Sequence, residues 1–122
     1  MAIIKINEVE FEYNALDAAA VEKTETAMDK VIAEASEIKA DKSLKLSQAI
    51  RAICGTVFEC FNALFGEGTD KKVFGESCDM GKALDAFGQL TNQIKTANAG
   101  IEVESIVQKY MPNRQQRRAG KK

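Results

Sequence analysis

The stretch that decides the fold is "SLKLSQAIRAICGTVFECFNALFGEG", residues 43–68. Its apolar side chains recur at alternating three- and four-residue steps, which places them on one face of an α-helix. Ser43 before the run and Gly66 after it are residue types that commonly begin and end helices. The pattern predicts a helix over about 43–65 at the centre of the core, with one apolar stripe made of Leu46, Ile50, Ile53, Val57, Phe61 and Leu64.

Similar stripes lie on both sides of this segment. The preceding residues predict a helix over about 17–40 that begins at Asp17, with its stripe at Val21, Met28, Val31, Ile32, Ala35 and Ile38. The following helix is expected over about 79–98, with its stripe at Met80, Leu84, Phe87, Leu90 and Ile94. After Gly100 a short helix over 102–110, with Val103, Ile106, Val107 and Tyr110 on one side, should stop before Pro112.

The first residues alternate between apolar and polar side chains, which is the period of a β-strand. A two-residue turn at Asn7 and Glu8 would pair Ile6 with Val9 and Ile4 with Phe11, giving a hairpin over 3–13. The glycine-punctuated residues 66–77 are typical of a connector with a short turn at 70–74. The predicted fold is therefore mainly α: one globular domain over residues 1–111, with three to four helices and an N-terminal β-hairpin. Gly55 implies either a close neighbour or a bend in its helix.

The composition argues against catalysis. The chain has no histidine, so neither a Ser/His nor a Cys/His nucleophile pair is available. The cysteines Cys54, Cys60 and Cys78 lack CxxC spacing, and Cys54 and Cys60 fall in an apolar helical pattern where reduced cysteine acts as a small core residue. Neither a phosphate-binding loop nor an EF-hand matches the glycine-rich connector. We expect a protein that is not an enzyme and uses no cofactor or metal.

Charge is distributed unevenly along the 122 residues. Six basic residues and no acidic ones lie within 109–122, whereas the remaining 11 basic residues are set against 18 acidic ones, a formal charge of −7. Residues 112–122 are expected to form a basic flexible tail, with candidate partner-binding residues Arg114, Arg117, Arg118, Lys121 and Lys122. The tail can be a solvated end, can pair with the acidic helix 17–40, or can dock on an acidic partner.

Nucleic acid is the partner that the sequence favours least. Six basic side chains are enough for salt-sensitive, non-specific binding to phosphates. The rest of the chain is acidic, however, and the tail carries no interleaved aromatic residues after Tyr110. No long apolar segment or leader pattern is apparent, so a cytoplasmic protein with no membrane association is expected.

Two segments resemble a known group of proteins. The ending "YMPNRQQRRAGKK", residues 110–122, is similar to the PNRxQRR close of small phage and prophage tail-module proteins of Gram-positive bacteria, and "FGEGTDKKVFGE", residues 65–76, is similar to a segment of such proteins. The chain resembles tail assembly chaperones, which bind the tape measure protein in the host cytoplasm while tube subunits polymerise around it. The resemblance covers the C-terminal half best.

The resemblance implies a non-catalytic helper that binds the tape measure protein or another tail protein. Its expected contacts are the part of the apolar face of helix 43–65 that the core leaves free, and the side chains of Arg114, Arg117 and Arg118, which would steer an acidic partner. An alternative is a structural subunit of the particle, a minor tail or connector protein, whose helices form a homo-oligomer that stays in the virion. A third alternative is a nucleic-acid-binding accessory protein.

Overall fold

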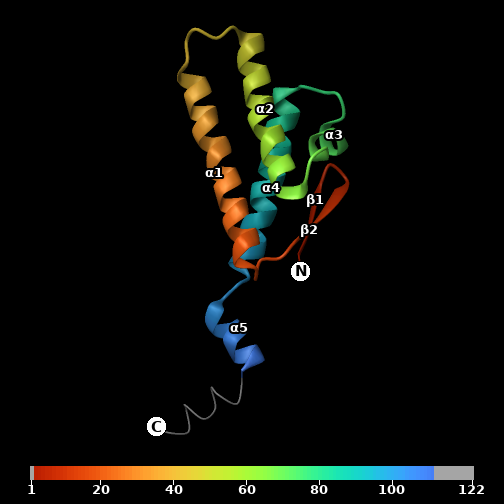
Figure 1. The fold of residues 1–122 in the computed structure, drawn as a ribbon, viewed down its shortest axis with the longest axis vertical. Helices are drawn as coiled ribbons and strands as arrows, with labels where there is room; N and C mark the ends of the chain where they lie inside the picture. Colours follow the sequence, from red (N-terminus) through yellow and green to blue (C-terminus); the bar gives the residue numbers. More distant parts are fainter. Residues whose placement is uncertain (1, 112–122) are drawn as a thin grey trace.

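The computed structural model describes residues 2–111, and it confirms a mainly α fold with an N-terminal β-hairpin (Figure 1). All of the predicted helices and both strands are present, with ends that differ from the prediction by a few residues. The elements are β1 (Ala2–Ile6), β2 (Val9–Tyr13), α1 (Ala18–Ala40), α2 (Leu46–Phe65), α3 (Thr69–Phe74), α4 (Met80–Ala99) and α5 (Val103–Tyr110).

The hairpin has the predicted register. Ile6 pairs with Val9 and Ile4 with Phe11 in an antiparallel ladder. Asn7 and Glu8 have φ angles of 48° and 71°, so both adopt the left-handed conformation that a two-residue type I′ turn requires. Ile4 and Ile6 are fully buried, and Phe11 stacks on Phe65 of α2 with 4.1 Å between the ring centroids. The hairpin therefore covers the lower end of α2.

A glutamine of α4 covers one edge of this hairpin. The side-chain amide of Gln93 donates to the carbonyl oxygen of Lys5 at 2.7 Å and accepts from the backbone N–H of Lys5 at 2.8 Å. These are the hydrogen bonds that a third strand would make at this position. A strand edge left open is a site for pairing with another chain, and Gln93 occupies this one at Lys5.

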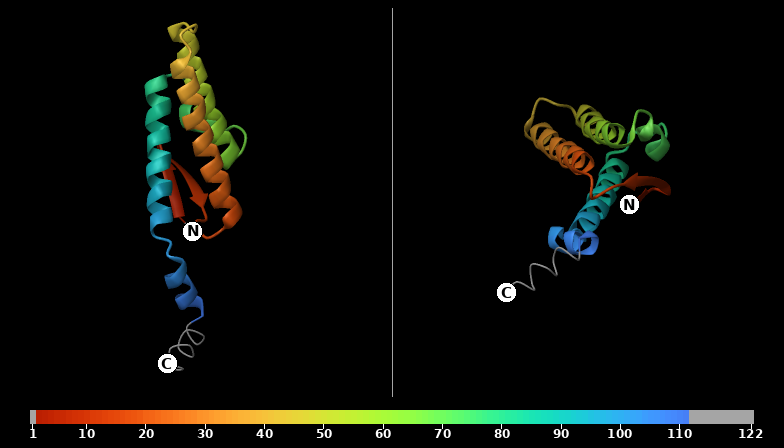
Figure 2. Two further views of the ribbon diagram at one scale, coloured as in Figure 1. Left: turned by 90° about the vertical axis from the view of Figure 1, so that its left-hand side faces the viewer. Right: turned by 60° about the horizontal axis from the view of Figure 1, so that its bottom comes forward.

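α2 is the central helix of the body, and it contacts α1, α4 and α3. α2 and α4 run in the same direction and α1 runs in the opposite one (Figure 1). The fully buried side chains Val57 and Phe61 of α2 and Leu90 of α4 are at the centre of the core. The ends of α1 and α2 that are joined by residues 41–45 extend beyond the start of α4 as a two-helix tip (Figure 2).

Two predicted stripes differ from those observed. Ile32 of α1 is 60% exposed, and the residues of α1 that are buried are Thr24, Ala27 and Val31. Thr24 can be buried because its hydroxyl donates to the carbonyl oxygen of Ala20 at 2.8 Å. α1 is therefore rotated from the predicted orientation, and its small residues approach the bundle while Ile32 faces outward.

On α4 the stripe is also displaced toward small residues. Ala83 and Ala86 are fully buried together with Leu90, whereas Leu84 is 43% exposed. Small side chains at the contact allow α4 to approach its neighbours closely. Of the predicted stripe, Leu90 and Ile94 are buried, Met80 and Phe87 are partly buried and Leu84 is exposed, which matters for the surface described below.

The start of α2 and the connector after α2 both differ from the prediction. Ser43 does not begin α2; its N–H and hydroxyl bind the carboxylate of Asp41, and the helix begins after Lys45, whose N–H donates to Gln48 Oε1 at 2.8 Å. The connector is more than a turn, since Thr69–Phe74 forms the helix α3. α3 forms because Phe74 packs its ring against Phe61, with 5.5 Å between the ring centroids, which anchors the segment on α2.

Gly55 lies inside α2 beside open space. A β-carbon added at Gly55 would meet no atom within 4 Å, so no neighbouring helix requires a glycine there.

Cys54 and Cys60 are buried in the core, as predicted. Burial raises the pKa of Cys60 to about 11, and burial together with a hydrogen bond to the Cys78 thiol raises the pKa of Cys54 to about 11. Both buried thiols are therefore protonated at neutral pH.

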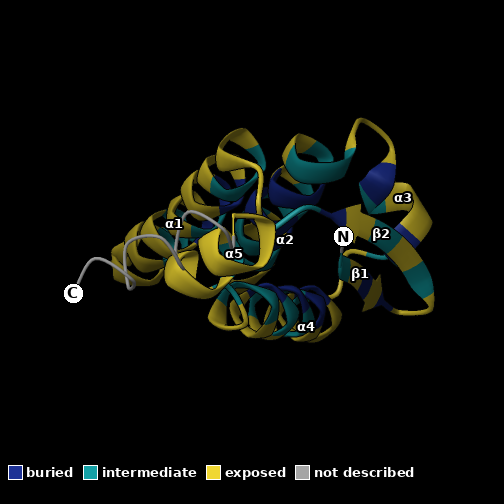
Figure 3. Ribbon diagram, turned by 90° about the horizontal axis from the view of Figure 1, so that it is seen from below, coloured by how far each residue is buried: buried dark blue, intermediate teal, exposed yellow. Residues whose placement is uncertain are grey.

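α5 is the one predicted element of the globular domain that adds nothing to the core. None of its residues is buried (Figure 3), and it projects beyond the lower end of α4 (Figure 1). Its apolar residues have the predicted spacing, but none of them belongs to the core cluster or packs against it. The globular body therefore ends near Ala99.

Candidate interaction surface

An open groove runs between α1 and α4, because these helices both pack against α2 and leave space between them. Its volume is about 730 Å³. The apolar lining comes from Met28 and Ile32 on α1 and from Phe87, Ile94 and Ala99 on α4. We call this the α1–α4 groove. Ile32 and Phe87, which the sequence assigned to core stripes, lie here because small residues take the buried positions of both helices.

Polar and charged side chains complete the lining of the groove. Glu25 and Asp29 contribute from α1, and Thr91, Lys95 and Asn98 contribute from α4. Asn98 is held in place because its Oδ1 accepts a hydrogen bond from the hydroxyl of Tyr13 at 2.7 Å. The groove thus has an apolar floor, two acidic side chains on its α1 side, and the basic side chain of Lys95 on its α4 side.

Tyr13 connects the hairpin to the lower end of this groove. Burial raises the pKa of Tyr13, the hydrogen bond to Asn98 lowers it, and the nearby charge of Glu25 raises it further. The phenol therefore stays protonated over the physiological range and donates to Asn98. The hairpin fixes the end of the groove at which Glu25 and Asn98 lie.

The lining of the groove has the pattern of a receptor for an amphipathic helix. Such receptors present apolar side chains from two helices along a trough with charged residues at its margins. Leu84, one turn before Phe87 and 43% exposed, extends the same side of α4 beyond the groove.

The surface that the sequence favoured is mostly unavailable. The apolar face of α2 is used by the core from Cys54 onward, where Val57 and Phe61 are fully buried. Apolar surface of α2 is left in its first turns, where Leu46 is 75% exposed, and in its last turn, where Leu64 and Phe65 are only partly buried. The predicted partner-binding residues Arg114, Arg117, Arg118, Lys121 and Lys122 lie outside the described residues.

The acidic residues of α1 are divided between two sides of the helix. Glu25 and Asp29 face the α1–α4 groove, whereas Glu34 accepts a hydrogen bond from the hydroxyl of Thr56 on α2. Lys30 and Glu59 make an exposed ion pair of 3.7 Å that also joins α1 to α2, and such pairs contribute little to stability. Only part of the acidic surface of α1 is therefore free to attract a basic segment.

Among residues 2–111 there is no group of three or more His, Cys, Asp or Glu side chains placed to hold a metal ion. Within the same range, no helix combines the length and apolar character that crossing a membrane requires.

Comparison with known proteins gives one match. No curated protein and no solved structure matches the chain. The match is to a protein family, and it extends over residues 7–121, which includes the hairpin turn, the three long helices, α5 and the basic ending. Since this match covers nearly the whole chain, the protein belongs to a family of unknown function, DUF6673.

Proposed function

We propose that this protein is a non-catalytic assembly factor, similar to a phage tail assembly chaperone, that binds an amphipathic helix of a tail protein such as the tape measure protein. The observation that carries the proposal is the α1–α4 groove, with its apolar floor of Met28, Ile32 and Phe87 and its charged margins. A helper of this kind needs a stable body and a surface that shields apolar helices of another chain until assembly.

The groove suits this role because it is open and already formed. Occupying it buries apolar surface on both partners, which is the main favourable contribution to such an association. Glu25 and Asp29 on one margin favour a helix with basic residues on the matching side. In the proposed mechanism the client helix is held in the groove, and Arg114, Arg117 and Arg118 steer an acidic part of the same client.

The groove is tested by co-expressing the tagged protein with the tape measure protein of its own tail module. Ile32→Lys places a charge in the groove at a side chain that is 60% exposed, so the fold should be retained. We expect recovery of the client to fall by about tenfold or more, since a difference of about 1.4 kcal/mol is enough for that change. The matched control is Leu46→Lys at the two-helix tip, which is 75% exposed and outside the groove. Equal recovery by both variants would refute the assignment of the groove.

The role of the tail is tested separately. A chain ending at Met111 keeps the groove and lacks the candidate arginines. We expect weaker recovery of the client by this shorter chain, with a smaller dependence on salt, because the steering by the arginines depends on ionic strength and is lost. Recovery equal to that of the full chain at every salt concentration would remove the tail from the mechanism.

The second candidate function is a structural subunit of the particle, and the projecting helix α5 favours it. α5 exposes an apolar side that nothing in the described chain covers, as the contact helix of an oligomer would. Presence of the protein in purified virions would support this candidate, and its absence from them would support a transient helper.

A further inference from the structure

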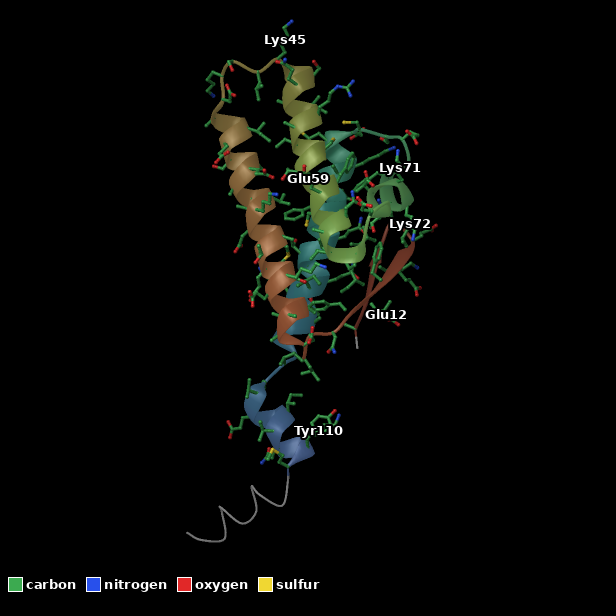
Figure 4. The ribbon with its side chains drawn as sticks, viewed as in Figure 1. Glu12, Lys45, Glu59, Lys71, Lys72 and Tyr110 are labelled. Carbon is green, nitrogen blue, oxygen red and sulfur yellow. The ribbon has the colours of Figure 1, made fainter. Side chains whose placement is uncertain are left out.

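The starting observation is that α5 is an amphipathic helix none of whose residues is buried by the described chain, residues 2–111. Val103 is 75% exposed, Val107 41% and Tyr110 67%, and Figure 4 shows Tyr110 near the end of this projecting segment. An isolated helix shorter than about 12–15 residues is marginal in water, and α5 has 8 residues. Its helical structure therefore requires a surface on which to bury its apolar side.

We propose that α5 docks in the α1–α4 groove of a second copy of this chain, so that two copies exchange their α5 helices in a closed dimer. Within residues 2–111 the groove is open and the apolar side of α5 lies outside the core, and every copy carries one of each. The exchange satisfies both at once, with the same patch used on the two partners, as a twofold dimer requires.

The direction of α5 explains why a second copy is the occupant. α5 continues away from the lower end of α4 (Figures 1 and 2). The groove of its own chain is lined by α1 and α4 of the body. To reach that groove, the chain would have to reverse between Gly100 and Glu102. The N–H of Ile101 donates to the carbonyl oxygen of Asn98 at 3.0 Å, and after this single turn the chain continues away from the body (Figure 1). Two bodies placed with their lower ends together need no such reversal.

The lengths of the two surfaces agree. α5 spans about 12 Å, since an α-helix rises about 1.5 Å per residue. The groove extends along α4 from Phe87 to Ala99, which is about 18 Å by the same rise. The docked helix would run antiparallel to α4 of the partner subunit, with Val103 near the end at which Ala99 lies and Tyr110 toward Ile32.

The antiparallel direction follows from how the two bodies meet. α5 continues away from the lower end of α4 (Figure 1), so with the two lower ends together it runs along α4 of the partner subunit from Ala99 toward Phe87. At a rise of about 1.5 Å per residue, Lys109 comes near the level of Asp29 of the partner subunit, and Glu104 comes near the level of Asn98 of the partner subunit. The pairing of Lys109 with Asp29 of the partner subunit is the complementary charge contact of this arrangement.

This inference goes beyond the proposed function, because the exchange needs no client. Both use the same groove, and a client helix would have to displace α5. The dimer would therefore keep the apolar groove covered until a client is present, which limits aggregation through exposed apolar surface.

The test measures the oligomeric state of the full chain by sedimentation equilibrium at micromolar concentration. Val107→Asp alters α5 and leaves the groove intact, whereas Ile32→Lys alters the groove and leaves α5 intact. We expect the unaltered chain and the Leu46→Lys control to be dimeric, and the dissociation constant of each of the other variants to rise by about tenfold or more. Both altered positions are exposed, so circular dichroism should show the unaltered fold.

Mixing the two variants distinguishes exchange from every other arrangement. The Ile32→Lys chain keeps an unaltered α5, and the Val107→Asp chain keeps an unaltered groove. These two parts can bind each other, so the mixture should form heterodimers at a concentration at which neither variant alone dimerises. A monomeric unaltered chain, assemblies larger than dimers, a dimer unaffected by Val107→Asp, or a mixture that stays monomeric would each overturn the proposal. Client recovery separates it from the proposed function: Val107→Asp should still bind the client, and Ile32→Lys should not.

Discussion

Replacing Phe61 with alanine should remove a large part of the stability of this protein. The ring of Phe61 is fully buried, at 0% exposure, with the Phe74 ring centroid at 5.5 Å and the Phe65 ring centroid at 6.3 Å. Truncating a buried phenylalanine to alanine costs about 3–5 kcal/mol, because apolar contacts are lost and a cavity is left. Since domains of this size are stable by only about 5–15 kcal/mol, we expect a marked fall in the free energy of unfolding.

The assay is urea denaturation followed by far-UV circular dichroism, at a protein concentration low enough that self-association makes no contribution. Leu46→Ala is the matched control, since Leu46 lies on the same helix and is 75% exposed. We expect the control to change the free energy of unfolding by no more than about 0.5 kcal/mol. Similar losses for the two variants would show that α2 does not pack as described, and the reasoning would fail.

Three further predictions concern α2 and the titrating side chains. Gly55→Ala should raise the free energy of unfolding by about 1 kcal/mol, because the added methyl group has open space and alanine favours the helix. Gly66→Ala should lower the free energy of unfolding, because the φ angle of Gly66 is +105°. Thermal denaturation of the two variants checks both expectations. At pH 8 iodoacetamide should modify the exposed Cys78 and should modify the two buried thiols only after unfolding, as peptide mass spectrometry can show. Burial raises the pKa of Tyr13, and it raises the pKa of Cys60 from 9.0 to about 11. The stability that these protonated groups contribute is therefore complete below about pH 9 and is lost as the pH rises toward 11. The urea concentration at the unfolding midpoint should fall across this range, and it should fall less steeply in Cys60→Ala.

Much of the local structure follows from short-range patterns in the sequence. Asp17 begins α1 as predicted, because its carboxylate accepts from the N–H of Ala20 at 2.9 Å. The hairpin register follows from a two-residue turn between alternating strands, although neither Asn7 nor Glu8 is glycine. The prediction that Ser43 begins α2 was wrong, because the hydroxyl of Ser43 donates to the carboxylate of Asp41 and the helix begins after Lys45.

The candidate site could be predicted only in part. The apolar residues of the α1–α4 groove are visible in the sequence, but the helical period assigns Ile32 and Phe87 to the core. No signal in the sequence shows that Ala27 and Ala83 take the buried positions instead, because that choice depends on how closely α1 and α4 approach their neighbours. The same limit applies to α3, which depends on the packing of Phe74 against α2.

By itself the sequence determined the elements: two alternating strands, three long amphipathic helices, a short one, and the burial of Cys54 and Cys60. These features follow from hydrogen bonding and side-chain spacing within one segment, so no knowledge of distant residues is needed. Only the tertiary structure decided which part of each apolar stripe is buried, where the α1–α4 groove opens, and that α5 is left without a surface to pack on. The physical reason is that burial is a property of pairs of elements, and the residues that cover one another here are far apart along the chain.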